Sequence, residues 1–172
     1  MGLEKTTVLY QNVVKELCVH TTKNIGVIKM SDYLDLIKKY EGLSLKPYKC
    51  AAGYPTIGYG NRFYEDGREV KLSDQPITKE RAEALLRDYV IKQISPKIEP
   101  LGLTDTQETA LISLIYNIGW TAFSRSKCYK AIKAKDWGTA FNNWDWISAG
   151  GKALNGLIKR RAEEIALFFT EI

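Results

Sequence analysis

Histidine and cysteine are scarce in this chain, and their scarcity excludes two common ways of stabilising a small domain. The 172 residues contain one histidine, His20, and three cysteines, Cys18, Cys50 and Cys128. Zinc sites use His and Cys at short spacings, and a disulfide framework needs an even number of cysteines. We therefore expect no metal site and no disulfide scaffold. A chain of this length buries about 70% of its unfolded surface, which is enough for one domain without such staples.

Long apolar runs are missing from the N-terminal segment, residues 1–30. Polar residues interrupt its apolar groups, so it has neither the apolar core of a signal peptide nor the ~20 apolar residues that span a membrane. We expect no export signal and no membrane insertion. The segment is interpreted as an N-terminal extension in front of one domain, residues 31–172. An upstream start that is not used in the cell is the alternative.

A strong charge imbalance is absent as well. Lysine and arginine outnumber aspartate and glutamate by 25 to 20, which gives a formal net charge of +5. This excess is mild beside that of dedicated nucleic-acid binders. A net positive charge of this size suits approach to an anionic polymer, but an ordinary basic surface explains the same charge equally well.

What the sequence does contain is a short amphipathic helix that ends on an acid. Asp32 is a suitable N-cap, Leu34 and Ile37 follow at helical spacing, and Gly42 suits the left-handed residue that closes a helix. Glu41 is then in the last turn, at the negative end of the helix dipole. This position, with shielding by a nearby tyrosine, favours the protonated carboxyl that a general acid needs.

A glycine-rich turn follows this helix and carries two further polar groups. Residues 51–54 predict a turn and residues 55–59 a strand. Cys50 and Thr56 flank the turn, and we expect them to be cross-strand neighbours with Cβ atoms on the order of 5 Å apart. Such a pair could hold one water. Taken singly, the three residues have ordinary explanations: a solvated acid, a small buried thiol and a strand former. Their conjunction at one turn favours a site.

Downstream patterns predict mainly helix. Residues 62–64 and 69–71 flank an Asp-Gly pair and predict a small strand pair. Thr78 is expected to cap a long helix that ends around Pro96 or Pro100. Its apolar face is expected to comprise Ala82, Leu85, Leu86, Tyr89, Val90 and Ile94. Thr104 and Gln107 form a capping box for a buried helix that ends at Gly119, and shorter helices are expected at residues 126–134, 137–146 and 157–169.

The run Gly53-Tyr54-Pro55-Thr56-Ile57-Gly58-Tyr59-Gly60, with Glu41 and Cys50 at their spacings, resembles the catalytic signature of phage-type lysozymes, glycoside hydrolase family 24. The resemblance covers residues 31–170 and extends to Tyr116-Asn117-Ile118-Gly119 and to residues 156–164. It implies an α+β fold in which a small β-hairpin lobe is joined by a long helix to a mainly helical C-terminal lobe. One departure is Asn61, where many members have a histidine that we interpret as structural.

The resemblance implies an enzyme that cleaves peptidoglycan at the β-1,4 bond between N-acetylmuramic acid and N-acetylglucosamine, without a cofactor. Glu41 would protonate the leaving oxygen, and a water held by Thr56 and Cys50 would attack from the opposite face with inversion. Family members have Asp or Cys at the middle position. Cys50 can position water as a thiol, act as a base or attack directly, and we favour water positioning.

Three further residues enter by analogy with the family. Asn117 matches a polar cleft residue on the same helix and is expected to contact sugar. Arg160 or Arg161 is expected to reach the acid, although an arginine on a C-terminal helix is more often a surface cation.

Two other functions compete with hydrolysis. One is a catalytically impaired wall-binding protein on the same fold, suggested by Trp137, Trp144 and Trp146, which could stack on sugars or form helical core. The other is a nucleic-acid binder that uses Lys127, Lys130, Lys133 and Lys135. These lysines alternate with few aromatics and lack a known fold signature, so we expect no nucleic acid.

The lysozyme reading also implies where the protein acts and with what. We expect a monomer that is made in the bacterial cytoplasm, acts on the cell wall in the periplasm and depends on a separate holin-type membrane permeabiliser.

Overall fold

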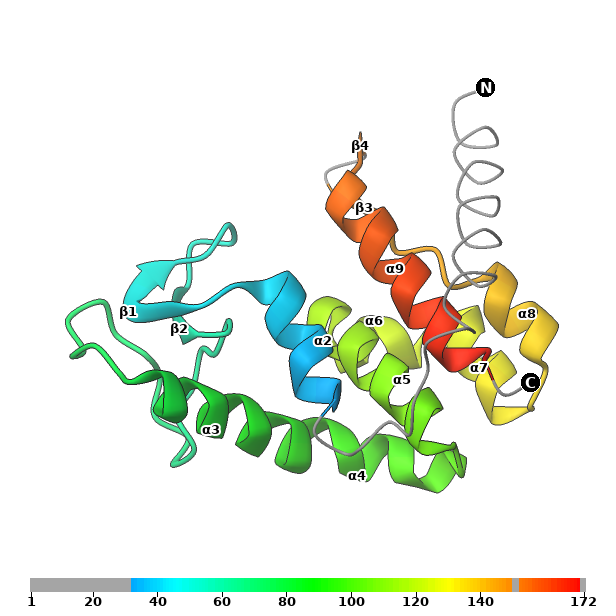
Figure 1. The fold of residues 1–172 in the computed structure, drawn as a ribbon, viewed down its shortest axis with the longest axis horizontal. Helices are drawn as coiled ribbons and strands as arrows, with labels where there is room; N and C mark the ends of the chain where they lie inside the picture. The colour runs from blue at the N-terminus through cyan, green and yellow to red at the C-terminus, as the bar shows by residue number, and fades with distance from the viewer. Residues whose placement is uncertain (1–31, 150–151, 171–172) are drawn as a thin grey trace. The chain divides into compact units, whose positions relative to one another are not determined.

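The computed structural model describes residues 32–149 and 152–170, which group into two compact units (Figure 1). The sheet unit comprises the described residues up to Lys97, and the helical unit begins at Ile98. Residues 1–30, including Cys18 and His20, lie outside the described residues, and their interpretation as an extension stays a prediction.

The sheet unit begins with helix α2 (Asp32–Glu41). Its apolar face forms as the spacing predicts, with Tyr33, Leu34 and Ile37 buried. Gly42 has φ +69°, so the helix closes on a left-handed residue. The cap prediction was wrong by one position, because the helix already includes Asp32.

Strands β1 (Ser44–Lys49) and β2 (Pro55–Gly58) form the predicted antiparallel hairpin. The Cys50 amide donates to Tyr54 O at 3.0 Å and the Gly53 amide to Cys50 O at 2.8 Å, which closes the turn. The expected pairing of Cys50 with Thr56 was wrong, because Tyr48 is the residue opposite Thr56. Residues 50–54 all belong to the loop, so Cys50 lies diagonally across from Thr56.

The second strand pair is reduced to a single bridge between Phe63 and Glu69. The segment between them is exposed and turns at Gly67, whose φ is +82°. Only Tyr64 and Val70 are buried here, in a small core with Ile57 and Leu85 from β2 and α3. With so little apolar surface to bury, pairing does not extend into regular strands.

A continuous helical run follows Thr78, which caps it by accepting from the Arg81 amide at 3.2 Å. It consists of α3 (Lys79–Tyr89), the π-helix η1 (Val90–Ile94), α4 (Ser95–Ile98) and the 3₁₀-helix η2 (Glu99–Leu101). The run ends one residue after Pro100, as expected. The predicted face is buried except for Tyr89, which is exposed, so that assignment was wrong.

The helical unit is built around α5 (Asp105–Ile118), whose capping box at Thr104 and Gln107 forms as predicted. Helix α9 (Asn155–Phe168) packs along α5 (Figure 1). The predicted helix over 137–146 stops at residue 142, and Trp144 is buried beyond its end. The remaining elements are α6 (Trp120–Ser124), α7 (Lys127–Lys133), α8 (Trp137–Asn142) and the paired strands β3 (Ser148–Ala149) and β4 (Lys152–Ala153).

Within residues 32–149 and 152–170, the longest helices are too short and too polar to cross a bilayer. The same ranges contain no cluster of three His, Cys, Asp or Glu side chains with the arrangement of a metal site.

Candidate active site

The first candidate residue, Glu41, is held in place by the packing of α2. Its side chain is half-buried, and Ile37, one turn earlier, is fully buried. On another side of the helix the Lys38 ammonium pairs with Asp35 at 3.1 Å and with Glu83 of α3 at 3.2 Å. Apolar packing and this bridge therefore fix the end of α2 within the sheet unit.

The second candidate, Cys50, has a half-buried thiol at the start of the hairpin loop. The backbone amides of Tyr54 and Ala52 interact with its sulfur as hydrogen-bond donors, and the Thr56 hydroxyl lies within reach of it. These bonds, with the positive charge of Arg62, outweigh partial burial and lower the pKa of the thiol below its ordinary value. The loop thus favours the thiolate, the reactive form of cysteine.

The third candidate, Thr56, is 98% buried, with only 2% of its surface exposed. Its hydroxyl donates to Tyr54 O at 3.0 Å and is also within hydrogen-bonding reach of the Cys50 sulfur. A hydroxyl has one hydrogen and two lone pairs, so it can donate to only one of these partners at a time. When it donates to the carbonyl, its lone pairs are available to a water.

Tyr48 links the hairpin to the acid. Burial raises the pKa of its hydroxyl, and the negative charges of Cys50 and Glu41 add to this effect. Such a contribution requires both charges to lie near the phenol. Tyr48 therefore lies near both Cys50 and Glu41, and it pairs with Thr56 across the hairpin.

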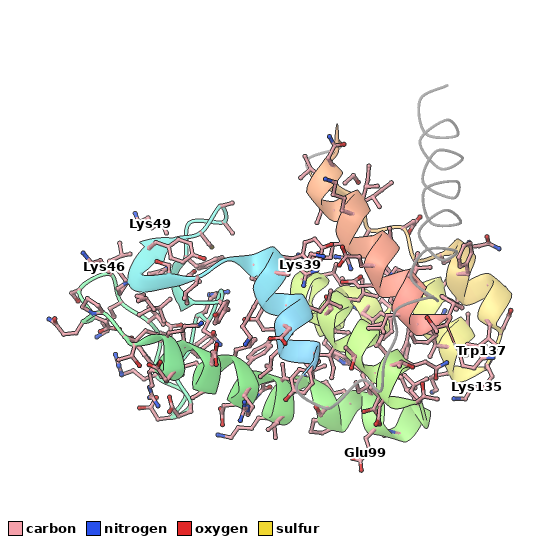
Figure 2. The ribbon with its side chains drawn as sticks, viewed as in Figure 1. Lys39, Lys46, Lys49, Glu99, Lys135 and Trp137 are labelled. Atoms are coloured by element: carbon pink, nitrogen blue, oxygen red, sulfur yellow. The ribbon has the colours of Figure 1, made fainter. Side chains whose placement is uncertain are left out.

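Arg62 belongs to this group, and sequence reasoning missed it. Its guanidinium stacks on the Tyr54 ring with Cζ 3.7 Å from the ring centroid, and its charge acts on Cys50. Stacking of this kind holds a long cation in one orientation. No local pattern signals it, because an exposed arginine after a glycine-rich turn is ordinary. Figure 2 shows two further cations, Lys46 and Lys49, projecting from the adjoining strand β1.

Asn61, the departure from the family pattern, has a structural role as interpreted. It is buried, its side-chain amide donates to Leu85 O at 3.4 Å, and its backbone exchanges two 2.9 Å hydrogen bonds with Ile57. The residue thus ties the end of the hairpin to α3.

The fourth candidate, Asn117, lies near the end of α5 in the helical unit, with an exposed side chain. Its Oδ1 accepts a hydrogen bond from Nη2 of Arg161. The fully buried Arg161 also donates from Nη1 to Glu164 at 2.6 Å. Because the Asn117 oxygen is engaged, its NH₂ group is the part that can donate to a ligand.

Glu164 is the centre of a buried polar cluster that sequence reasoning also missed. Arg160 donates to its Oε1 at 3.1 Å, Ser113 donates to the same oxygen at 2.7 Å, and Trp144 donates to Oε2 at 3.3 Å. Burial raises the pKa of this carboxyl, and the two guanidiniums oppose that effect. The surface-cation reading of the arginines is wrong. The spacing of Glu164 from Arg160 and Arg161, four and three residues, was the available signal.

Two of the residues that suggested the competing functions have structural roles. Trp144 is fully buried in contact with the Phe168 ring, at a centroid distance of 5.0 Å, and is therefore core rather than a sugar platform. Lys135 donates to Leu101 O at 2.7 Å and to Gly102 O at 2.9 Å, beside Trp137 (Figure 2). Its charge thus caps the carbonyl end of η2.

Comparisons with known proteins agree with these observations. The sequence profile of the phage lysozyme family matches residues 38–164. The endolysin of Acyrthosiphon pisum secondary endosymbiont phage 1 is 42% identical over 143 residues, which are 78% of this chain and 93% of that protein. The endolysin of Bacillus phage B103 is 39% identical over 80% of this chain, a match that spans 52% of that longer relative. A variant of P22 lysozyme superposes with a TM-score of 0.68 and 33% identity, over 84% of this chain and 99% of that one.

Proposed function

The chain belongs to the phage lysozyme family, and we propose that it cleaves the β-1,4 bond between N-acetylmuramic acid and N-acetylglucosamine with inversion of configuration. Family membership makes it an endolysin, a glycoside hydrolase that acts on peptidoglycan in cell lysis. Its fold is the lysozyme-like α+β fold, with a small two-stranded sheet and a mostly helical body. The bond that is cut, the stereochemistry and the residue roles are the proposal.

Glu41 acts as the general acid. It protonates the glycosidic oxygen as the bond breaks, which lets the sugar leave as a neutral alcohol. Its half-buried place in the last turn of α2, near Tyr48, supports this role.

Cys50 and Thr56 hold the attacking water. The observation that carries this proposal is the pair itself: a thiol whose pKa is lowered by the loop, beside a buried hydroxyl with lone pairs to offer. The Cys50 sulfur accepts a hydrogen bond from the water and the Thr56 oxygen accepts another. As the water oxygen bonds to the anomeric carbon, its proton passes to bulk solvent, and Glu41 is reprotonated from solvent for the next cycle. The positive charge of Arg62 acts on the sulfur. An inverting hydrolase needs such a water on the face opposite its acid.

Asn117 contacts the substrate by donating from its NH₂ group. Arg161 holds the Asn117 oxygen, and Glu164 holds Arg161, so the amide is presented in one orientation. A donor in a fixed orientation suits an acceptor such as the carbonyl oxygen of an N-acetyl group.

The protein acts as a monomer on peptidoglycan in the periplasm, after synthesis in the cytoplasm. A separate holin-type permeabiliser opens the membrane to it. Residues 31–172 constitute the catalytic domain.

The anomeric configuration of freshly released reducing ends tests the mechanism. Purified peptidoglycan is digested and followed by proton NMR before mutarotation. Inversion of the β-1,4 bond gives the α-anomer first. A β-anomer as the first product, or a glycan found covalently attached to Cys50 by mass spectrometry, would instead indicate a double displacement through the thiol.

A further inference from the structure

A cavity of about 320 Å³ lies in the sheet unit, lined by side chains of the loop at residues 63–67 and of α3 and η1. Glu41, Cys50 and Thr56 are not among its lining residues. Its volume falls in the lower part of the range of small-ligand sites, ~300–1,000 Å³. It is therefore large enough for a ligand of the size of one sugar ring and has no part in the reaction described above.

Exposed aromatic rings flank this cavity. Phe63 is 45% exposed and Tyr89 is 40% exposed, while Leu85, which also lines it, is buried. Tyr89 occupies a position at which the helical pattern predicts a core residue, yet its ring remains at the surface beside the cavity. Two exposed rings beside an apolar base form a surface that a ligand with an apolar face can cover.

Charged groups complete the lining. Asp88 pairs with Lys92 at 2.7 Å, and Glu65 accepts from Arg81 at 2.6 Å. Each pair leaves carboxylate lone pairs that can accept from hydroxyl groups, and the Lys92 ammonium can donate to a carbonyl. The lining thus combines aromatic faces with acceptors and a donor.

The π-helix η1 is a second, independent observation at this place. It begins at Val90, directly after Tyr89, and contains Lys92. The π-helix is a rare conformation that occurs frequently at functional sites. Here it interrupts the helical run where the run lines the cavity. The buried positions 82, 86, 90 and 94 recur every four residues. In an α-helix, each step of four residues rotates the side chain by ~40° around the helix axis, away from the buried face. The wider turn of the π-helix corrects this rotation.

We propose that this cavity binds one N-acetyl amino sugar of a peptidoglycan glycan strand, as a second wall-binding site outside the catalytic centre. Sugar rings present C–H faces to aromatic side chains and hydroxyl donors to carboxylates, and an N-acetyl group offers its carbonyl to Lys92. The substrate is a polymer of such sugars, so one strand or its neighbour can occupy both sites. This occupancy raises the local concentration of enzyme on the wall. The inference rests on the proposed function for the identity of the polymer.

The test uses the full chain with Glu41→Gln, so that binding is measured without turnover. Isotope-labelled protein is titrated with a tetramer of N-acetylglucosamine, which carries no peptide. We expect amide shifts at Phe63 and Tyr89 as a set separate from those at Cys50. Phe63→Ala with Tyr89→Ala should abolish the first set and weaken sedimentation with purified sacculi about tenfold or more. Ile91→Ala is the matched control, because Ile91 is exposed on the same helical run and does not line the cavity.

Two outcomes would overturn the inference. The first is a titration in which the sugar tetramer shifts only the amide signals around Cys50. A peptidoglycan stem peptide that shifts the amide signals of Phe63 and Tyr89 when the tetramer does not would count in the same way. The second is sedimentation of the double variant equal to that of Ile91→Ala. Asp88→Asn keeps both rings and should also weaken binding, which guards against a folding defect in the double variant. The proposed function is tested separately: if the Glu41→Gln protein still lyses cell walls, the proposed function has failed, whatever the result at the cavity.

Discussion

Replacement of Glu164 by glutamine tests whether the buried cluster stabilises the helical unit and orients Asn117. Glutamine keeps the shape of the side chain and one carboxyl-like oxygen, and it removes the negative charge. Two buried guanidiniums, those of Arg160 and Arg161, then face a neutral amide. Removal of one partner from a buried ion pair costs about 3–5 kcal/mol, because the remaining charge has been taken out of water without compensation.

The expected change in melting temperature follows from this figure. In a protein of 150–250 residues, 1 kcal/mol corresponds to about 2–4 °C, so Glu164→Gln should lower Tm by about 6–20 °C. Differential scanning calorimetry and urea unfolding measure the loss. Glu99→Gln is the matched control, since Glu99 is exposed and projects away from η2 (Figure 2). A surface change of this kind is expected to stay within about ±0.5 kcal/mol.

A second readout separates stability from positioning. Below its Tm, the Glu164→Gln enzyme should have a raised KM for glycan, because Arg161 no longer holds the Asn117 oxygen from a fixed position. Asn117→Ala should raise KM in the wild-type background and add little in the Glu164→Gln background. If Glu164→Gln melts with the Glu99→Gln control, the stabilising role is refuted. If the two KM effects are additive, Asn117 does not depend on the cluster.

Four more predictions concern the proposed mechanism and the domain boundary. Glu41→Gln should lower turnover by about 10²–10⁴-fold with unchanged Tm, because the amide keeps the shape and cannot donate the proton; clearing of a peptidoglycan suspension measures it, and retained turnover contradicts the acid assignment. Cys50→Asp should stay active while Cys50→Ala is severely impaired, since the position needs an acceptor for water; equal rates for both variants would contradict the role. In a Cys18→Ser background, the alkylation rate of Cys50 should rise with pH, and the midpoint of this rise should lie below that of a free cysteine, because the pKa of the Cys50 thiol is lowered. The buried Cys128, whose pKa is raised to about 12, should not react in the folded protein. A chain that starts at Met30 should clear cell walls comparably to the full chain, and a soluble, folded but inactive truncation would contradict this boundary.

Features set by neighbouring residues could be predicted from the sequence. The caps at Thr78 and Thr104 and the turn at Gly42 form as expected, because each depends on side-chain and backbone groups within four residues. The hairpin was also predicted, but its register was not. Whether Cys50 or Tyr48 faces Thr56 depends on how many residues the loop takes, and the composition of the loop leaves that number open.

Features that depend on contacts between residues far apart in the sequence were not predicted. Tyr89 fits the helical pattern of a core position, yet its ring lies exposed beside a cavity that the distant loop at residues 63–67 also lines. Glu164 resembles a surface acid until Ser113 and Trp144, 51 and 20 residues away, are seen to donate to it. Both cases involve a partner outside the local window, which periodicity does not detect.

The candidate site combines both kinds of information, as the surroundings of Cys50 show. The loop provides two backbone amides for the Cys50 sulfur, and any residue at that position receives them, because they depend on the turn and not on the side chain. Thr56 and the positive charge of Arg62 complete the surroundings of an anion. An aspartate would meet the same donors and the same charge. The surroundings of Cys50 therefore favour a negative group at this position, and they lower the pKa of its thiol.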